Sequence, residues 1–185
     1  MLKDNGTKTG EVIMASSTIN EQAKQHTISM TVENHFGTLN RVAGLFAAKG
    51  YNIDSLTVGP TEDDAVSRMT IVTRGDDQII EQIMKQLHKL IDTIKVVDLT
   101  DDTFVDRELA MVKVQCTPTT RMEIMQISEI FRAKVVDISS KTITLEVTGS
   151  QLKVDAIINM LKPFGIKELA RTGRIAIKRE FQGEV

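Results

Sequence analysis

The stretch VENHFGTLNRVAGLFAAKGYNIDSLTVGP, residues 32–60, decides the fold of the first half of the chain. Apolar and polar residues alternate over 27–32, as they do in a strand with one buried face. After a turn that contains Gly37, apolar residues recur at i, i+3, i+4 and i+7, namely Leu39, Val42, Ala43 and Phe46. Gly50 is placed to end this helix, and a second strand follows at once. The stretch therefore predicts a strand, a helix and a strand in succession.

The turn before the helix has the chemistry of an anion site. Backbone N–H groups around Gly37 lie at a helix N-terminus, where unpaired donors and the helix dipole favour negative charge. No catalytic side chain accompanies them in the sequence. The turn indicates a binding site for a small carboxylate, and with it a regulatory protein.

The rest of the first half continues this order. The turn 59–64 precedes a strand over 66–73, and a second helix begins where Asp76 or Asp77 can cap its N-terminus. The apolar stripe expected on this helix is Ile80, Ile83, Met84, Leu87 and Ile91. With a last strand over about 94–99, the predicted order is βαββαβ.

A second unit follows the polar run 98–106. Thr120 and Glu123 form a capping-box pattern ahead of a helix with apolar Ile124, Ile127 and Phe131. A further helix carries Val154, Ile157, Ile158 and Leu161 and ends near Pro163. The expected strands are 107–114, 134–139, 142–148, 166–171 and 174–179.

The two halves are weakly alike: TIVTRG (70–75) precedes one helix as TLEVTG (144–149) precedes another. We therefore expect an α+β protein of two tandem ferredoxin-like βαββαβ domains, each an antiparallel sheet with two helices on one face. The expected divisions are a disordered leader 1–26, a first domain 27–100, a linker 101–106, a second domain 107–180 and a tail 181–185. Units of this size are marginal alone, which favours a homodimer or a larger assembly.

Composition excludes several classes of protein. The 185 residues are 41% hydrophobic, and the net charge of −2 gives no reason to expect nucleic acid or an anionic membrane as a partner. No apolar run approaches the ~20 residues of a membrane span. Cys116 has no partner for an intrachain disulfide, which fits a reducing cytoplasm.

Other functions of the βαββαβ order lack their residues. RNA-binding domains of this topology need stacking aromatics and a basic face, but the chain has one Tyr and no Trp. Metal-carrying relatives need paired cysteines, and His26, His35 and His88 have no metal-ligand spacing. No nucleophile motif, phosphate-binding loop or dinucleotide fingerprint is present. The sequence thus predicts no catalytic site, no metal and no cofactor in this chain.

Several segments of the sequence resemble a known protein family. The stretch 32–60, with SRMTIVTRGDD (67–77) and EQIMKQLHKL (81–90), resembles the ACT domain of the regulatory, small subunit of acetolactate synthase, also called acetohydroxyacid synthase. RELAMVKV (107–114), SEIFRAKVVDIS (128–139) and FGIKELARTGRIAIKRE (164–180) resemble the C-terminal domain of that subunit. The resemblance covers roughly residues 27–180.

The resemblance implies a subunit that activates a catalytic subunit and makes it sensitive to feedback inhibition by branched-chain amino acids, usually valine. The effector is expected between two ACT domains of a dimer, and the matching positions are Asn34, Gly37, Thr38, Leu39, Asn40, Asn52 and Ile53. Thiamine diphosphate, Mg and FAD are implied only for the catalytic partner. Lys49 and Phe36 depart from the family pattern, and Phe36 bears on the shape of the effector pocket. The alternative is a free-standing amino-acid-sensing ACT protein with another client.

Overall fold

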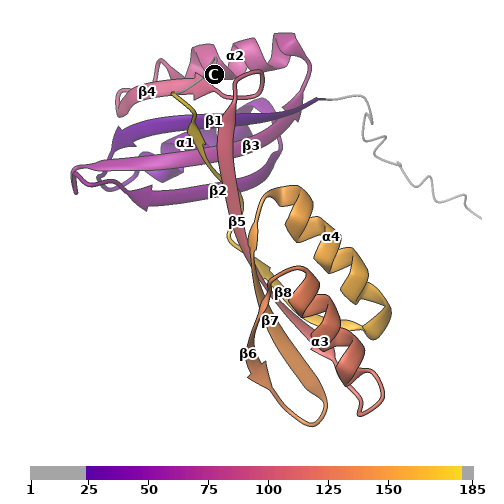
Figure 1. Cartoon of the computed structure of the whole chain (residues 1–185). Helices are drawn as coiled ribbons and strands as arrows, with labels where there is room; N and C mark the ends of the chain where they lie inside the picture. The colour runs from indigo at the N-terminus through magenta and orange to yellow at the C-terminus, as the bar shows by residue number, and fades with distance from the viewer. Residues whose placement is uncertain (1–23, 181–185) are drawn as a thin grey trace, which may run out of the picture.

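The computed structural model describes residues 24–180, which form two units joined by a long strand (Figure 1). Each unit is one antiparallel sheet with two helices on one face, as the sequence predicts. The expected leader and tail lie outside the described residues, apart from the last three positions of 1–26. Those three begin strand β1 instead. No helix in residues 24–180 has the length and hydropathy to cross a membrane.

The first unit has the sheet order β2-β3-β1-β4. Its elements are β1 (Lys24–Glu33), α1 (Thr38–Lys49), β2 (Ile53–Pro60), β3 (Val66–Gly75), α2 (Asp77–Leu87) and β4 (Thr93–Asp98). The alternation of β1 buries Ile28, Met30 and Val32 against the two helices. The carboxylate of Asp76 accepts from the N–H of Ile79 at 2.8 Å, so Asp76 caps α2 as expected.

Two residues of the predicted α1 stripe, Leu39 and Ala43, are not among the buried core residues. Leu39 is 46% exposed, whereas Thr38, Val42 and Phe46 are buried. The hydroxyl of Thr38 donates to the carbonyl of Glu33 at 3.1 Å, which turns Thr38 inward. Successive helical residues are about 100° apart around the axis, so Leu39 faces outward.

The predicted stripe of α2 is also wrong at its last member. The helix ends at Leu87, and Ile91 is 88% exposed. The chain tightens into three-residue turns here, because the N–H of Leu90 donates to the carbonyl of Leu87 at 3.2 Å. This tighter rotation brings Leu90, rather than Ile91, against the core.

The second unit has the sheet order β6-β7-β5-β8, with β9 paired to the other half of β5. Its elements are β5 (Phe104–Gln115), α3 (Arg121–Ile130), β6 (Lys134–Ile138), β7 (Thr142–Gly149), α4 (Gln151–Leu161), a 3₁₀ turn (Lys162–Phe164), β8 (Ile166–Arg171) and β9 (Ile175–Lys178). A separate core, which includes buried Cys116, lies between this sheet and α3 and α4. The two similar segments of sequence occupy equivalent places, at the ends of β3 and β7.

The capping box predicted at Thr120 is wrong. The side chain of Thr120 makes no capping hydrogen bond, and its hydroxyl accepts from the N–H of Thr117 at 3.0 Å. Thr117 takes the capping role, because its hydroxyl accepts from the N–H of Thr120 at 3.2 Å and its carbonyl accepts from Arg121 at 3.0 Å. Pro118 follows, at the position where proline is favoured in a first helical turn.

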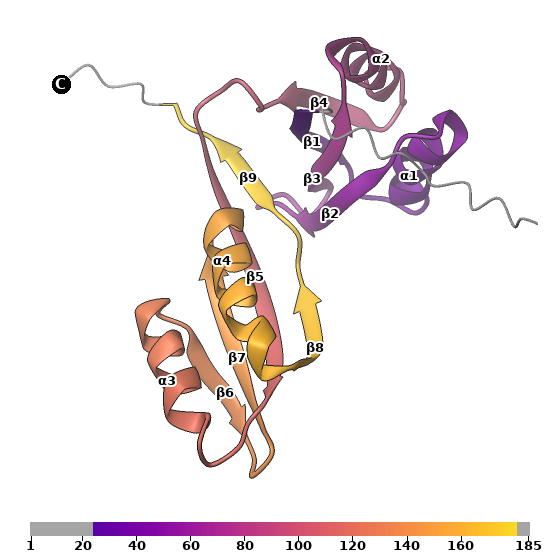
Figure 2. The same ribbon diagram turned by 90° about the vertical axis from the view of Figure 1, so that its right-hand side faces the viewer.

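Strands β5 and β9 cross from one unit to the other (Figure 2). The beginning of β5, Phe104–Arg107, pairs antiparallel with Ile175–Lys178 of β9, so part of the expected linker 101–106 is a strand. Ala176 is buried, and its N–H lies 3.4 Å from the hydroxyl of Thr70 on the face of the first sheet opposite the helices. The last strand of the chain thus contacts the first unit.

Candidate functional site

The turn between β1 and α1 presents unpaired backbone donors. Gly37 is the N-cap of α1 with φ of 90°, a left-handed conformation that favours glycine. Glycine has no side chain with which to cap the helix. The N–H groups of Gly37, Leu39 and Asn40 do not donate to any backbone carbonyl in the turns, loops and helix caps of residues 24–180. These donors and the helix dipole can hold a carboxylate.

The side chains around this turn have different roles. Asn34 donates from its amide to the carbonyl of Asp64 at 2.8 Å, while its backbone N–H donates to Ala65 at 2.7 Å. The amide of Asn34 is therefore held in place. Leu39 and Asn40 are exposed. Thr38 is buried, and its hydroxyl is used within the turn.

The remaining candidate residues lie at the other end of α1. Asn52 donates to the carboxylate of Asp54 at 2.9 Å, and its carbonyl accepts from the hydroxyl of Thr73 at 2.6 Å. Ile53 packs partly against the first core. The 12 residues of α1 span about 18 Å at 1.5 Å per residue. The structure therefore brings Asn34, Gly37, Leu39 and Asn40 together, but not with Asn52 and Ile53 of the same chain.

His35 connects the turn to the rest of the first unit through hydrogen bonds and ion pairs. Nδ1 of His35 lies 3.2 Å from the carbonyl of Phe36 and 3.3 Å from the hydroxyl of Thr38. Its Nε2 lies 3.0 Å from Asp92 and 3.4 Å from Glu33. The hydrogen bond to the Phe36 carbonyl, followed by the nearby carboxylates, raises the pKa of His35 above its ordinary value. Protonated His35 can donate from both ring nitrogens, which stabilises this arrangement.

The carboxylate of Asp92 is buried and joins this cluster to α1. It also forms an ion pair with the guanidinium of Arg41, 51 positions earlier in the chain. Sequence reasoning missed this set, because the separation gives no periodic or motif-like pattern. The ligand atoms of Glu33, His35 and Asp92 lie within 4.8 Å of one another, as in a metal site. Since Arg41 already supplies the cation to Asp92, we interpret the cluster as an ion-pair network that supports the turn.

Comparisons with known proteins cover both units. Residues 28–95 match the family described as an AHAS small subunit-like ACT domain, and residues 107–180 match the family described as the small subunit of acetolactate synthase. The acetolactate synthase small subunit of Aquifex aeolicus is 55% identical over 161 residues, which cover 86% of this chain and 83% of that protein. The chain belongs to the acetolactate synthase small-subunit family.

Further relatives agree across the whole described region. The small subunit of Bacillus subtilis is 51% identical over 84% of this chain and 91% of its own length. The crystal structure of the Thermotoga maritima small subunit superposes with a TM-score of 0.76 at 43% identity, covering 84% of this chain and 98% of that one. As a small subunit, the chain is the regulatory component of an acetolactate synthase, and its family membership implies a catalytic large subunit as partner.

The raised pKa of His35 predicts a pH dependence of stability. A group whose pKa is higher in the folded state stabilises that state fully below its unfolded value, near pH 6.5, and loses the effect as pH rises through the folded value. We expect His35→Gln to destabilise the small subunit more at about pH 6 than at about pH 9, as measured by urea unfolding.

A matched control is His88→Gln, because His88 is exposed and forms no ion pair among residues 24–180. This control should show little change with pH. A His35→Gln penalty that is equal at both pH values would show that the ring acts by packing and not by its charge.

Proposed function

We propose that this small subunit is the valine-sensing component of its acetolactate synthase, which activates the catalytic subunit and restrains it when branched-chain amino acids accumulate. The observation that carries the proposal is the turn at Gly37, a left-handed N-cap with unpaired N–H groups. A free amino acid has the complementary chemistry, with a carboxylate, an ammonium and a side chain.

Each part of a branched-chain amino acid has a counterpart among the candidate residues. The free N–H groups of Gly37, Leu39 and Asn40 and the helix dipole favour the carboxylate by ~0.3–1 kcal/mol, and by up to ~2 kcal/mol when partly buried. The side-chain oxygens of Asn34 and Asn52 can accept from the ammonium. Burial of an isopropyl or isobutyl group against Leu39 and Ile53 adds about 1.5–3 kcal/mol. Apolar burial therefore favours valine or leucine over glycine.

A dimer can bring together the two halves of the candidate site, which lie apart in one chain. Asn34 and Asn52 of one chain lie before and after α1, whose 12 residues span about 18 Å, so one amino acid does not contact both. A twofold axis can bring the Gly37 turn of one protomer to Asn52 of its partner, and it generates two equivalent sites. We therefore propose that the effector binds between two first units.

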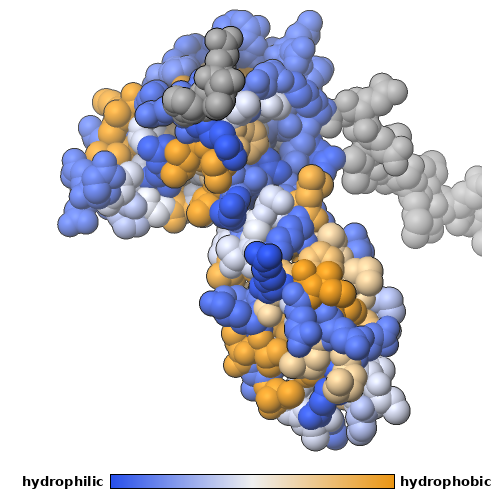
Figure 3. All heavy atoms as spheres, viewed as in Figure 1, coloured by the Kyte–Doolittle hydropathy of each residue, from blue (hydrophilic) through white to orange (hydrophobic). Residues whose placement is uncertain are grey.

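Exposed surface supports this assembly. Phe36, in the turn, is fully exposed, and β2 lies at an open edge of the first sheet. An unpaired edge strand and an exposed aromatic ring both favour contact with another chain. Figure 3 shows that hydrophobic surface, in orange, is interspersed with hydrophilic surface, in blue, on both units.

The dimer model predicts rescue between two defective chains. Gly37→Asp and Asn52→Ala should each weaken valine binding alone. When they are mixed and allowed to exchange protomers, mixed dimers should have one intact site, and roughly one quarter of all sites should recover. Calorimetric titration with valine would measure this fraction.

The control for this rescue is each variant incubated alone under the same conditions. If exchange is verified by a mass tag and no high-affinity site returns in the mixture, then Asn52 and the Gly37 turn do not meet across a dimer interface.

The alternative function is a free-standing amino-acid sensor with another client. The match of residues 107–180 to the acetolactate synthase small subunit favours the acetolactate synthase complex, because a general ACT sensor does not need this second unit. Co-purification of the chain with an endogenous thiamine-diphosphate enzyme would discriminate between the two.

We expect the purified chain not to convert pyruvate to acetolactate, and to raise the rate of its cognate catalytic subunit. Valine should then reduce that raised rate. An acetolactate assay with the chain alone, the catalytic subunit alone and both together would measure this. Turnover by the isolated chain, or an unchanged rate of the complex, would contradict the proposal.

A further inference from the structure

The turn between β8 and β9, residues 172–174, lies against strand β2 of the other unit. The hydroxyl of Thr57 in β2 donates to the carbonyl of Thr172 at 3.1 Å. Gly173 has φ of 83°, and a Cβ added to it would lie 3.0 Å from the Thr57 hydroxyl and 3.2 Å from Cβ of Ser55. The contact is thus close enough to require glycine. Strand β2 begins at Ile53, directly after the effector candidate Asn52.

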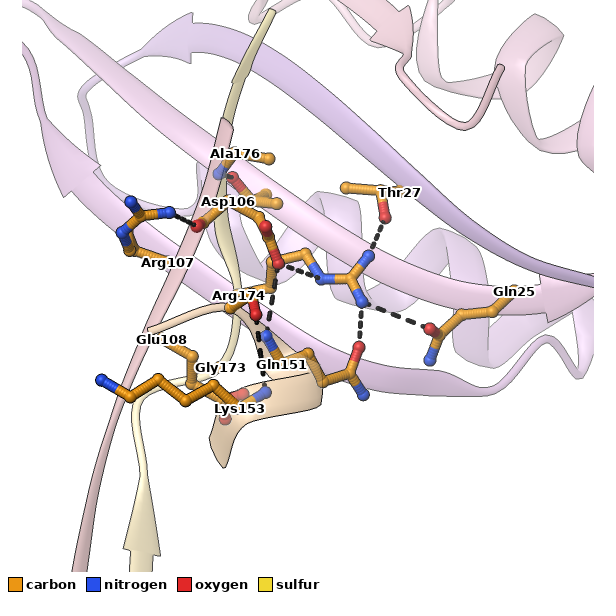
Figure 4. Close-up of polar contacts among 12 residues, drawn as sticks. Gln25, Thr27, Asp106, Arg107, Glu108, Gln151, Lys153, Gly173, Arg174 and Ala176 are labelled. Carbon is orange, nitrogen blue, oxygen red and sulfur yellow. Dashed lines mark hydrogen bonds and ion pairs between the residues drawn. The ribbon is translucent and has the colours of Figure 1, made fainter. Parts of the chain in front are cut away.

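The next residue, Arg174, joins the two units (Figure 4). Its guanidinium donates to Thr27 and Gln25 of β1 in the first unit, and to Gln151 at the start of α4 in the second unit. Nε lies 3.7 Å from the carboxylate of Asp106 in β5. The side chain is only 12% exposed, so these contacts are made largely out of water.

The same turn is fixed to the second unit on its other side. The N–H of Thr172 donates to the carbonyl of Leu109 in β5 at 3.0 Å. The preceding residue, Arg171, forms a bidentate pair with buried Glu108 at 2.6 and 2.8 Å. The turn therefore contacts β2 through its backbone and is held by β5 through hydrogen bonds.

We propose that the turn Thr172–Arg174 transmits effector occupancy from the first unit to the second, with Gly173 and Arg174 as its positioning residues. This inference rests on the proposed effector site at Asn52 and Ile53. A shift at the start of β2 on effector binding moves Ser55 and Thr57 against Gly173. Because Thr57 is hydrogen-bonded to the turn and Arg174 is bonded to both units, the turn and the second unit move with β2.

Wild-type protein provides a test that needs no variant. Hydrogen exchange of the small subunit, with and without saturating valine, should show a change in protection in peptides that span 170–178. The exchange rates of the Thr172 and Ala176 N–H groups report on these contacts directly, since the two groups donate to the carbonyl of Leu109 and the hydroxyl of Thr70. Valine binding without any change in exchange over these residues would overturn the inference.

Two variants test the coupling in the complex with the catalytic subunit. Arg174→Gln removes the positive charge and most N–H donors of the guanidinium. Thr57→Val removes the hydroxyl that contacts Thr172 and keeps nearly the same side-chain volume. Each should raise the valine concentration for half-inhibition by about fivefold or more, while valine binding by calorimetry and activation without valine stay within about twofold of wild type.

The matched control is Arg107→Gln, because Arg107 is an exposed arginine near the turn whose guanidinium, among the residues that the structure describes, hydrogen-bonds to the carbonyl of Asp106 alone (Figure 4). It should leave inhibition unchanged. A merely structural role of Arg174 would lower stability, binding and activation together and would not separate binding from inhibition. Unchanged inhibition in folded Arg174→Gln and Thr57→Val would overturn the coupling role alone, whereas absence of valine binding by wild type would overturn the proposed function and this inference with it.

Discussion

Gly37→Asp is expected to weaken valine binding by at least about tenfold, or ~1.4 kcal/mol, while the complex stays assembled and activated. The new carboxylate would lie beside the N–H groups proposed to bind the valine carboxylate, and like charges at close range repel. A Cβ on Gly37 meets no atom within 4 Å, so the substitution does not overpack the turn. The substitution alters no residue of the second unit, so we expect activation to be retained.

Gly37→Asn is the control that isolates charge. Asn and Asp have nearly the same size, and both tolerate the left-handed conformation at φ 90° better than other side chains do. Valine titration of both variants, with an activation assay alongside, should show a much larger loss for Asp than for Asn. Wild-type affinity in folded Gly37→Asp would remove this turn from the effector site.

Periodicity in the sequence was enough to predict both units and their order of elements. Strands with one buried face and helices with one apolar stripe are encoded locally, so β1 and α4 could be located from neighbouring residues alone. The errors lie at helix ends and at the expected domain boundaries, since part of the expected linker 101–106 is a strand and residues 24–26 begin β1. Leu39 and Ile91 continue the apolar pattern in sequence, but a hydroxyl at Thr38 and a tight turn after Leu87 change the rotation of the chain there.

Contacts between distant segments could not be predicted in this way. The sequence identified β9 as a strand, yet only the structure shows that it pairs with the start of β5 and contacts the first sheet. The ion pair of Arg41 with Asp92 likewise depends on how α1 packs beside the turn before β4. Such pairs leave no mark in local patterns, because each partner alone resembles an ordinary surface charge.

The candidate site likewise has one part that could be predicted from local sequence and one part that could not. The anion-binding turn at Gly37 could be inferred from a strand, a glycine and a helix in sequence, and the structure has the left-handed N-cap that this inference needs. The family resemblance supplied Asn52 and Ile53, and their separation from the turn became evident only in three dimensions. That separation is the physical reason to expect a second chain at the site.

Arg171→Met is expected to destabilise the small subunit by about 3 kcal/mol, because it leaves the buried carboxylate of Glu108 without its partner. The side chain of Glu108 is only 4% exposed, and Arg171 also binds Asp155 in α4 at 2.8 Å. Glu108 and Asp155 raise the pKa of Arg171, so its guanidinium stays charged at every pH below its already high ordinary value.

Two comparisons by urea unfolding make the Arg171 prediction specific. Lys113→Met removes an exposed pair with Glu168 from the same sheet and should cost no more than about 1 kcal/mol. The double variant Arg171→Met, Glu108→Leu should recover much of the loss, since an apolar pair needs no solvation of charge. If the single and double variants are equally destabilised, the cost comes from the packing of the arginine side chain and not from an unpaired Glu108 carboxylate. Recovery in the double variant would instead show that the cost of Arg171→Met is that of leaving the buried Glu108 carboxylate unpaired.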